Sequence, residues 1–243
     1  MIFKSYILEQ NLQTVDKYKT FLFYGENQGL KKEFKEKLKL HYRDNEVLNL
    51  YQDEIIKNKN ILINEITTGS LFVNKKVILI NEATDKIVEV LIELIELIQE
   101  EKIFIFSDAL DKRSKLRNLF EKTTTCVVVP CYQDNEITIK RIISSGLKNY
   151  SGLTPNVVNL IVQNTNLDRN KVNNEIDKIK SCFTERKIDQ LKLISLLNIK
   201  TNDDFNLLKD EALNGNKIKT NRLLADTVFE SENNVYYLNL INQ

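Results

Sequence analysis

Short apolar runs in the first half of the chain limit its fold more than any other feature of the sequence. Charged segments with apolar residues at helical spacing separate them. The runs lie at 21–24, 47–50, 77–80, 103–106 and 126–129. Continuous apolar runs are typical of strands buried on both faces, and helices between them are typical of a parallel sheet. The sequence therefore predicts an α/β domain that ends near Cys131.

The spacing of apolar residues predicts helices between these strands. Leu30, Phe34 and Leu38 indicate a helix over 30–41. Further helices are expected near 53–66, 84–100 and 114–121. In 84–100 one polar stripe interrupts a surface of mostly Ile, Leu and Val, so we expect most of that helix to be buried. The stripe consists of Lys86, Glu89, Glu93, Glu96 and Glu100.

After Pro130 the strand-like runs stop, and the rest of the chain is predicted to be helical. Thr154 is expected to be an N-cap with Pro155 at the first helical position, and Asp168 is a candidate cap for the next helix. The expected helices are 138–150, 155–164, 167–183, a short pair within 187–197, 205–213 before a stop at Gly215, 218–229 and 234–241. This pattern divides the chain into domains at 1–132, 133–200 and 201–243.

Charge and composition exclude several classes of function. Lys plus Arg is 35 and Asp plus Glu is 34, a formal net charge of +1. This balance excludes a strongly basic tail and leaves room only for a local basic patch. Cys126, Cys131 and Cys182 form no CxxC pair, and His41 is the single histidine. We therefore predict reduced thiols and no metal site.

The sequence also lacks the marks of a targeting or membrane-spanning segment. Its first ten residues, MIFKSYILEQ, have neither the basic start nor the long apolar stretch of a signal peptide. The most apolar run, 87–98, is interrupted by three glutamates and cannot span a membrane. We expect a cytoplasmic protein with no membrane partner.

One turn between a predicted strand and a predicted helix invites comparison with a phosphate-binding loop. It reads GENQGLKK from Gly25 to Lys32. A working loop follows GxxxxGK[ST], in which backbone amides and the lysine bind phosphates and the hydroxyl binds magnesium. Here Gly29 comes one residue early, Leu30 displaces Lys31 from the place of the lysine, and no hydroxyl follows. The glycines are interpreted as simply making a turn.

The partner strand also lacks its catalytic residues. It ends in Asn81-Glu82, so a neutral amide stands where a magnesium-binding aspartate belongs. Glu82 is interpreted as structural. We therefore predict a degenerate nucleotide site that binds neither nucleotide nor any other cofactor. Its residues are Gly25, Gly29, Lys31, Asn81 and Glu82.

These features resemble the delta subunit of the bacterial DNA polymerase III clamp loader, whose phosphate loop is degenerate. The similarity begins over 21–37 and continues in order over nearly the whole chain. It includes SLFVNKKVI at 70–78, FSDALDKRSKL at 106–116, a helix over 167–181 with NEIDKI at 174–179, and 205–224 with NGN at 214–216.

The resemblance implies an AAA+-like parallel-sheet domain, a three-helix lid domain and the start of a helical collar, truncated relative to the family and therefore expected to be incomplete. It implies binding to the beta sliding clamp, assembly with the gamma/tau and delta-prime subunits, and a role on primed DNA, without ATP hydrolysis by this subunit. Delta belongs to a holoenzyme classified as a DNA-directed DNA polymerase, a transferase, but this chain offers no paired carboxylates for two catalytic metals.

The resemblance also implies that Leu71 and Phe72 are the clamp-binding residues. In the family, an adjacent Leu-Phe pair projects from the first domain into an apolar pocket of the clamp. The pair follows Thr67-Thr68-Gly69-Ser70, a turn-like stretch that favours exposure. Exposed apolar side chains on such a tip are typical of a binding hot spot. The alternative is a pair of core residues preceding a strand.

A basic cluster follows the fourth apolar run. Lys112, Arg113, Lys115 and Arg117 are candidates for contact with a neighbouring subunit or with DNA phosphates, and a solvated helix face is the alternative.

Two other classes of protein compete with this interpretation. A divergent P-loop NTPase or nucleotide kinase requires the lysine-plus-hydroxyl and Asp-Glu motifs that this chain lacks. A delta-prime or gamma-type loader subunit requires a four-cysteine zinc module and a Ser-Arg-Cys motif, and the sequence contains neither.

Overall fold

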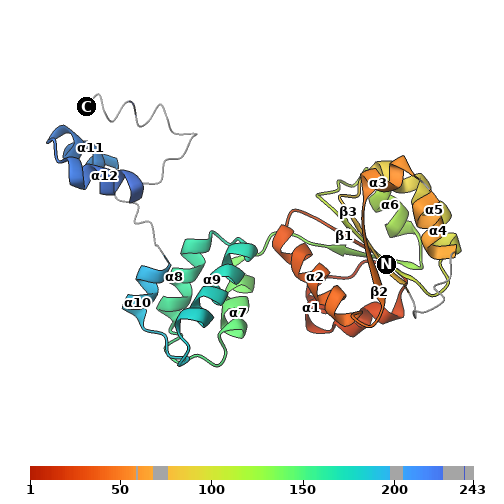
Figure 1. Ribbon diagram of the computed structural model, residues 1–243, viewed down its shortest axis with the longest axis horizontal. Helices are drawn as coiled ribbons and strands as arrows, with labels where there is room; N and C mark the ends of the chain where they lie inside the picture. Colours follow the sequence, from red (N-terminus) through yellow and green to blue (C-terminus); the bar gives the residue numbers. More distant parts are fainter. Residues whose placement is uncertain (59, 68–75, 198–204, 227–237, 239–243) are drawn as a thin grey trace. The chain divides into compact units, whose positions relative to one another are not determined.

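The chain folds into two compact units, residues 1–135 and 136–243 (Figure 1). The computed structural model describes residues 1–58, 60–67, 76–197, 205–226 and 238. The boundary between the units follows the last strand closely. The finer division of the second unit into 133–200 and 201–243 stays a prediction.

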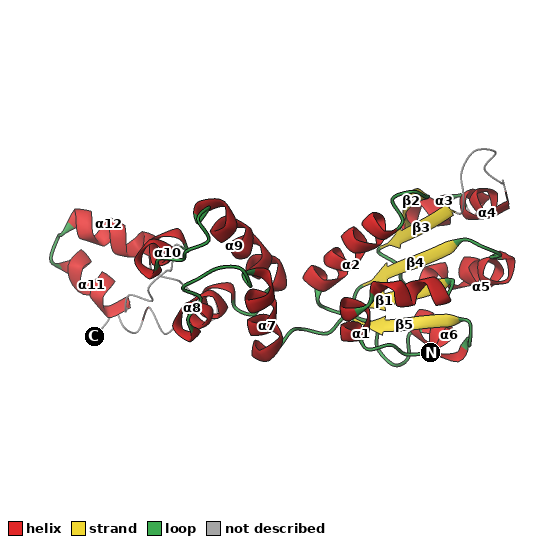
Figure 2. Cartoon of the chain, turned by 90° about the horizontal axis from the view of Figure 1, so that it is seen from below, coloured by secondary structure: helices red, strands yellow, loops and turns green. Residues whose placement is uncertain are grey.

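A five-stranded parallel sheet forms the centre of the first unit, as the apolar runs predicted. Its strand order is β2-β3-β4-β1-β5, so β1 lies between β4 and β5 (Figure 2). The strands are β1 Thr20–Tyr24, β2 Glu46–Tyr51, β3 Lys76–Asn81, β4 Lys102–Ser107 and β5 Cys126–Pro130. Every residue of β1 is buried, because both faces of this strand are covered.

Alternate residues of the strands supply two separate cores. Phe21 and Phe23 pack with Phe34 and Leu38 on one face, while Leu22 packs with the apolar residues of the other. The first face is covered by α1 Ser5–Gln10, the 3-10 helix Leu12–Lys17 and α2 Gln28–His41. The second is covered by α3 Gln52–Lys57, α4 Asn60–Thr67, α5 Val88–Leu97 and α6 Lys115–Lys122. The two-layer cover explains why the strands are continuously apolar.

Two predicted helices of this unit differ from the structure. The helix expected over 53–66 is two helices, because Asn58 leaves the helical conformation after α3. The helix expected over 84–100 is shorter: a 3-10 turn, Asp85–Ile87, capped by Thr84, precedes α5, which ends at Leu97. Ile92 and Leu97 are exposed together with the glutamates of the polar stripe, so the prediction that most of this helix is buried was too broad.

Helices form the second unit, and their caps follow the local sequence. Thr154 caps α8 and Asp168 caps α9, as predicted. The helix expected from Leu167 begins only at Arg169, because Asn166 and Leu167 both have left-handed backbones. The helices are α7 Glu136–Gly146, α8 Pro155–Thr165, α9 Arg169–Cys182, α10 Gln190–Leu196, α11 Phe205–Leu213 and α12 Lys217–Asp226.

The end of the chain is only partly described. Gly215, with a φ of +72°, makes the turn between α11 and α12, as expected from its place in the sequence. The helix predicted over 234–241 lies outside the described residues except for Leu238.

Two features are absent from the part of the chain that the structure describes. No helix there is long and apolar enough to cross a membrane. Nor does that part bring together three His, Cys, Asp or Glu side chains in a group suited to a metal ion. Cys126, Cys131 and Cys182 carry free thiols.

Candidate functional site

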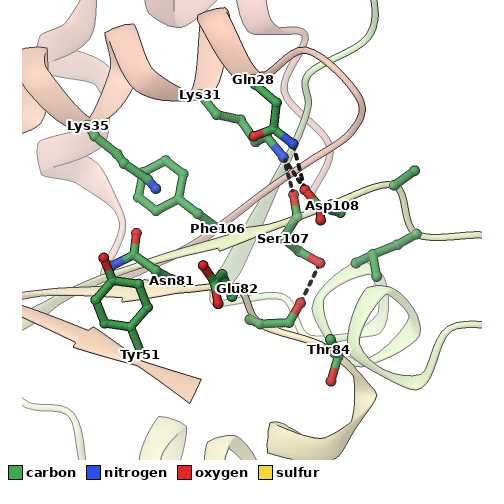
Figure 3. Close-up of a pocket in the computed structure, with 13 residues that line it drawn as sticks. Gln28, Lys31, Lys35, Tyr51, Asn81, Glu82, Thr84, Phe106, Ser107 and Asp108 are labelled. Carbon is green, nitrogen blue, oxygen red and sulfur yellow. Dashed lines mark hydrogen bonds and ion pairs between the residues drawn. The ribbon is translucent and has the colours of Figure 1, made fainter. Parts of the chain in front are cut away.

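A polar crevice opens at the carboxyl ends of the strands, where open parallel sheets bind their ligands (Figure 3). Its cavity measures about 520 Å³ and reaches from the first turn of α2 to the segments that follow β3 and β4. The polar or charged residues that line it include Gln28, Lys31, Lys35, Tyr51, Asn81, Glu82, Thr84, Ser107 and Asp108. Three of the residues predicted for a degenerate nucleotide site, Lys31, Asn81 and Glu82, therefore lie together here.

The loop between β1 and α2 uses its backbone amides within the protein. The N–H of Gly25 donates to the carbonyl of Asp108 at 3.2 Å, and that of Asn27 donates to the carbonyl of Cys131 at 3.1 Å. Gly25 has a φ of +138°, and a Cβ at this position would lie 2.2 Å from the Cys131 oxygen. In a phosphate-binding loop, such amides face the ligand. Here at least two of them are committed to neighbouring strand ends.

Lys31 extends from α2 into the crevice and is buried there. Its ammonium donates to the carbonyl of Ser107 at 2.7 Å and to Asp108 Oδ1 at 3.1 Å. Counted from Gly25, Lys31 is the seventh residue, as in GxxxxGK[ST]. The expectation that Leu30 displaces the lysine was therefore wrong. What the loop lacks is the second glycine, replaced by Leu30, and the hydroxyl, replaced by Lys32.

Asp108 is the acidic partner in this arrangement. The Gln28 side-chain amide donates to Asp108 Oδ1 at 2.7 Å. This hydrogen bond, followed by that from Lys31, holds the pKa of the Asp108 carboxyl below its ordinary value. The carboxylate is therefore charged and paired at neutral pH. No role of Asp108 could be predicted from the sequence, because its partners lie about 80 residues away in the chain.

Asn81 and Glu82 lie at the end of β3 with different surroundings. The Asn81 side-chain amide is buried and donates to Asn49 Oδ1 at 2.9 Å and to the carbonyl of Leu50 at 3.1 Å. It thus joins β3 to β2. Glu82 is exposed, and its φ of +55° is left-handed, which is uncommon for a residue with a side chain.

Lys35 is a second lysine of the crevice that the sequence analysis missed. It lies one helical turn after Lys31, and its ammonium lies 4.7 Å from the centroid of the Phe106 ring. Burial, together with the neighbouring Lys31 ammonium, lowers the pKa of Lys35. The four-residue spacing on α2 was the signal that could have identified it.

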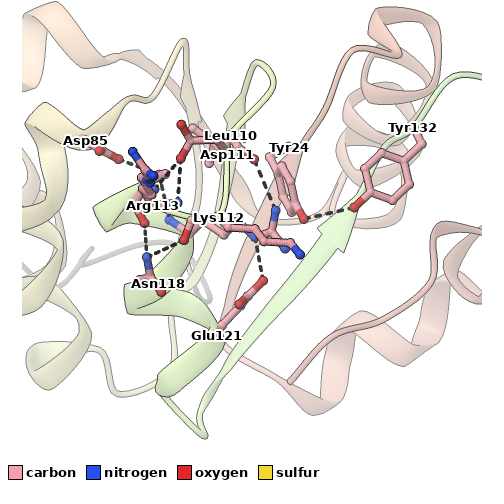
Figure 4. Close-up of polar contacts among 11 residues, drawn as sticks. Tyr24, Asp85, Leu110, Asp111, Lys112, Arg113, Asn118, Glu121 and Tyr132 are labelled. Carbon is pink, nitrogen blue, oxygen red and sulfur yellow. Dashed lines mark hydrogen bonds and ion pairs between the residues drawn. The ribbon is translucent and has the colours of Figure 1, made fainter.

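A hydrogen-bonded turn carries the predicted basic cluster (Figure 4). Asp111 Oδ1 accepts the N–H groups of Arg113 at 2.7 Å and Ser114 at 2.9 Å. The Ser114 hydroxyl caps α6 by accepting from the N–H of Arg117. The same hydroxyl donates to Asp85 Oδ1 at 2.6 Å. The backbone N–H of Leu116, followed by this hydroxyl, lowers the pKa of Asp85.

This turn exposes three cationic side chains. We call residues 110–115 the basic loop; it presents Lys112, Arg113 and Lys115 to solvent. Among the described residues, no carboxylate forms an ion pair with any of these three side chains. A preorganised backbone with unpaired cations suits an anionic partner.

Arg117, which the sequence placed in the same cluster, does not belong to it. Its guanidinium pairs with Glu121 at 2.7 Å, donates to the carbonyl of Leu110 at 3.3 Å, and lies 5.1 Å from the Tyr24 ring centroid. Arg117 therefore stabilises α6 and the basic loop from within. The i,i+4 spacing to Glu121 was a signal in the sequence, whereas the contact with Tyr24 of β1 depends on the tertiary structure.

The predicted clamp-binding residues lie outside the described part of the chain. α4 ends at Thr67 and β3 begins at Lys76, whereas Leu71 and Phe72 fall between them. Their role as an anchor stays a prediction.

A parallel sheet covered by helices on both faces, with a crevice at its carboxyl edge, defines an open α/β protein, and a helical unit follows it here. Residues 21–131 match the family model for the DNA polymerase III delta subunit. The matched segment runs from β1 through β5 and includes the crevice and the basic loop. The resemblance inferred from the sequence is thereby confirmed.

Solved structures show a similar fold. The Bacillus subtilis DNA clamp loader delta protein (YqeN) is 14% identical, with a TM-score of 0.60, and the match covers 98% of this chain and 75% of that one. The Thermotoga maritima RuvB Holliday junction branch migration motor is 11% identical, with a TM-score of 0.52, over 85% of this chain and 74% of that one. A search of curated protein sequences found no relative.

Proposed function

We propose that this chain acts as a clamp-loader delta subunit that binds the sliding clamp and helps open it for loading onto primed DNA. The observation that carries the proposal is the family match over residues 21–131, and the fold similarity to the B. subtilis clamp loader delta protein supports it. A subunit of this kind opens a ring only by binding the open form more tightly than the closed form.

The test is direct binding to the sliding clamp of the same organism, measured by surface plasmon resonance on immobilised clamp. The proposal expects saturable binding without added nucleotide. Absence of binding by a folded protein, confirmed by circular dichroism, contradicts it.

The proposal places this chain among other subunits rather than alone. Its partners are the gamma/tau and delta-prime subunits, the beta clamp and, in the assembled loader, primed DNA. The chain contributes no catalysis of its own. Its classification as a DNA-directed DNA polymerase would follow only from its membership of the holoenzyme.

The rival proposal, a divergent P-loop NTPase or nucleotide kinase, has less support. Lys32 stands at the hydroxyl position and Asn81 at the metal-binding position, which removes two magnesium ligands. The Lys31 ammonium is already bound to Ser107 and Asp108. A nucleotide has to break these contacts to gain its own.

We therefore expect no gain in melting temperature when millimolar ATP and magnesium are added. A ligand at a hundredfold excess over its dissociation constant stabilises a protein by about 2.7 kcal/mol, a shift that thermal unfolding easily detects. The control is the same titration with an ATP-hydrolysing subunit of the loader. A clear upward shift accompanied by hydrolysis supports the rival function instead.

The basic loop is proposed to contact DNA phosphates in the assembled loader. Replacing Lys112, Arg113 and Lys115 with glutamine is expected to weaken DNA binding uniformly across sequences. Each phosphate contact contributes about 0.9 to the slope of log K against log salt, so the slope should fall by as much as about 2.7. Fluorescence anisotropy with labelled primed DNA at several salt concentrations measures it.

A matched variant removes three exposed lysines of α2 instead. They are Lys32, Lys37 and Lys39. It changes the net charge equally, so an equal loss of slope in both variants assigns the effect to overall charge. An unchanged slope in the basic-loop variant, with a loss of subunit assembly, indicates a protein contact.

A further inference from the structure

Asn27, in the β1–α2 loop, makes three of the four hydrogen bonds that a side-chain amide can make. Its Oδ1 accepts the N–H of Leu30 at 2.9 Å and so caps α2. Its Nδ2 donates to the carbonyl of Tyr132 at 3.1 Å and to Asp134 Oδ2 at 2.7 Å. The residue is buried, so each lost partner leaves an unsatisfied polar group.

The residues that Asn27 holds form the last part of the first unit. We call residues 131–134 the terminal strap. The strand register ends at Pro130, opposite Tyr24, and α7 begins at Glu136. Two backbone hydrogen bonds hold its first residue: Cys131 N–H donates to the carbonyl of Tyr24 at 2.7 Å and its own carbonyl accepts from Asn27 N–H.

A second side chain supports this attachment. The hydroxyls of Tyr24 and Tyr132 lie 3.4 Å apart, and their rings meet edge to face (Figure 4). The Tyr24 side chain contacts the strap at Tyr132, whereas the Asn27 side chain also reaches Asp134. Asn27 in addition caps α2, which Tyr24 does not. An amide suits this position since it both accepts and donates.

We propose that Asn27 is a positioning residue that fastens the terminal strap to the β1–α2 loop without any bound ligand, so that the joint between the two units begins after Asp134. This inference rests on the proposed function in one respect: both assume that the β1–α2 loop is ordered without a nucleotide. The chain that leads into α7 is then held to the first unit as far as Asp134.

Asn27→Asp tests the proposal while keeping the cap of α2. The new carboxylate still accepts from Leu30 N–H, but it cannot donate to the strap and it repels Asp134. Cleavage by chymotrypsin after Tyr132 is expected to rise at least about tenfold, the effect of losing one hydrogen bond to a charged group. Amide hydrogen exchange at Cys131 is expected to rise with it.

A reciprocal change provides the rescue. Combining Asn27→Asp with Asp134→Asn restores a donor and an acceptor across the same contact, and cleavage is expected to return toward the parent rate. The control is Gln28→Ala, which removes a hydrogen bond from the same turn but none from the strap. It should leave cleavage after Tyr132 unchanged.

The outcomes separate this inference from the proposed function, because no clamp or nucleotide is needed. Unchanged cleavage in Asn27→Asp overturns the inference. So does faster exchange throughout β1, β4 and β5, which indicates general destabilisation, or failure of the double variant to recover. Loss of clamp binding with normal strap protection bears only on the proposed function.

Discussion

Replacing Leu71 and Phe72 together with alanine is expected to weaken binding to the sliding clamp by roughly a thousandfold while the fold stays intact. Truncation of a hot-spot residue costs about 2 kcal/mol or more, and two adjacent anchors together reach about 4 kcal/mol after allowance for non-additivity. The expectation rests on the family resemblance of 70–78 and on the turn-like residues before it. Clamp affinity and the urea midpoint must be measured on the same variant.

A matched control removes two apolar side chains that the structure shows to be exposed. Ile92 and Leu97 on α5 are 46% and 43% exposed, and replacing both with alanine should change neither affinity nor midpoint. The core alternative predicts a different result for Leu71 and Phe72. If both residues are buried in the core, each truncation costs about 2–5 kcal/mol of stability. A large fall in the urea midpoint, with unchanged clamp affinity of the folded protein, therefore rules out the anchor.

Gly25→Ala is expected to destabilise the protein by at least about 3 kcal/mol, through both backbone strain and a steric clash. Its φ of +138° is outside the range that side chains favour, and the added Cβ would lie 2.2 Å from the backbone oxygen of Cys131. Relief of the clash must move β5 away from β1 or break the hydrogen bonds of the loop. Urea unfolding monitored by circular dichroism measures the loss.

Gly215→Ala provides the comparison. Gly215 also has a positive φ, +72°, but no atom lies within 4 Å of its added Cβ. We expect a cost of about 1–2 kcal/mol, the strain of a left-handed residue alone. If the two substitutions cost the same, the close approach of Cys131 to Gly25 contributes nothing. If Gly25→Ala leaves the urea midpoint unchanged, the loop does not pack closely against Cys131 at the end of β5.

The strands were predictable because their signal is local. Four of the five apolar runs mark strands that are buried on both faces, which leaves no polar alternation to confuse with a helix; β2, at the edge of the sheet, is the exception. The same applies to the caps at Thr154 and Asp168, whose side chains bond to backbone only two or three residues away. The bounds of α11 were also predicted as the structure has them.

The polar contacts of the crevice were not predictable in the same way. Lys31 and Asp108 are 77 residues apart, and only the parallel pairing of β1 with β4 places their ends together. The early position of Gly29 led to the prediction that Lys31 is displaced from the lysine position, whereas the tertiary structure places its ammonium in the crevice. Similarly, the contact of the Arg117 guanidinium with the Tyr24 ring is long-range and separates Arg117 from its three basic neighbours.

The sequence by itself therefore determined the α/β class, the order of the strands along the chain, most helices and the family resemblance. These depend on burial patterns and on contacts within a few residues. The tertiary structure decided which cations are paired, which loop amides are engaged, and that Asn27 holds the end of the first unit. The physical reason is that a hydrogen bond or ion pair depends on distance in space, and strand order brings together residues that no local pattern relates.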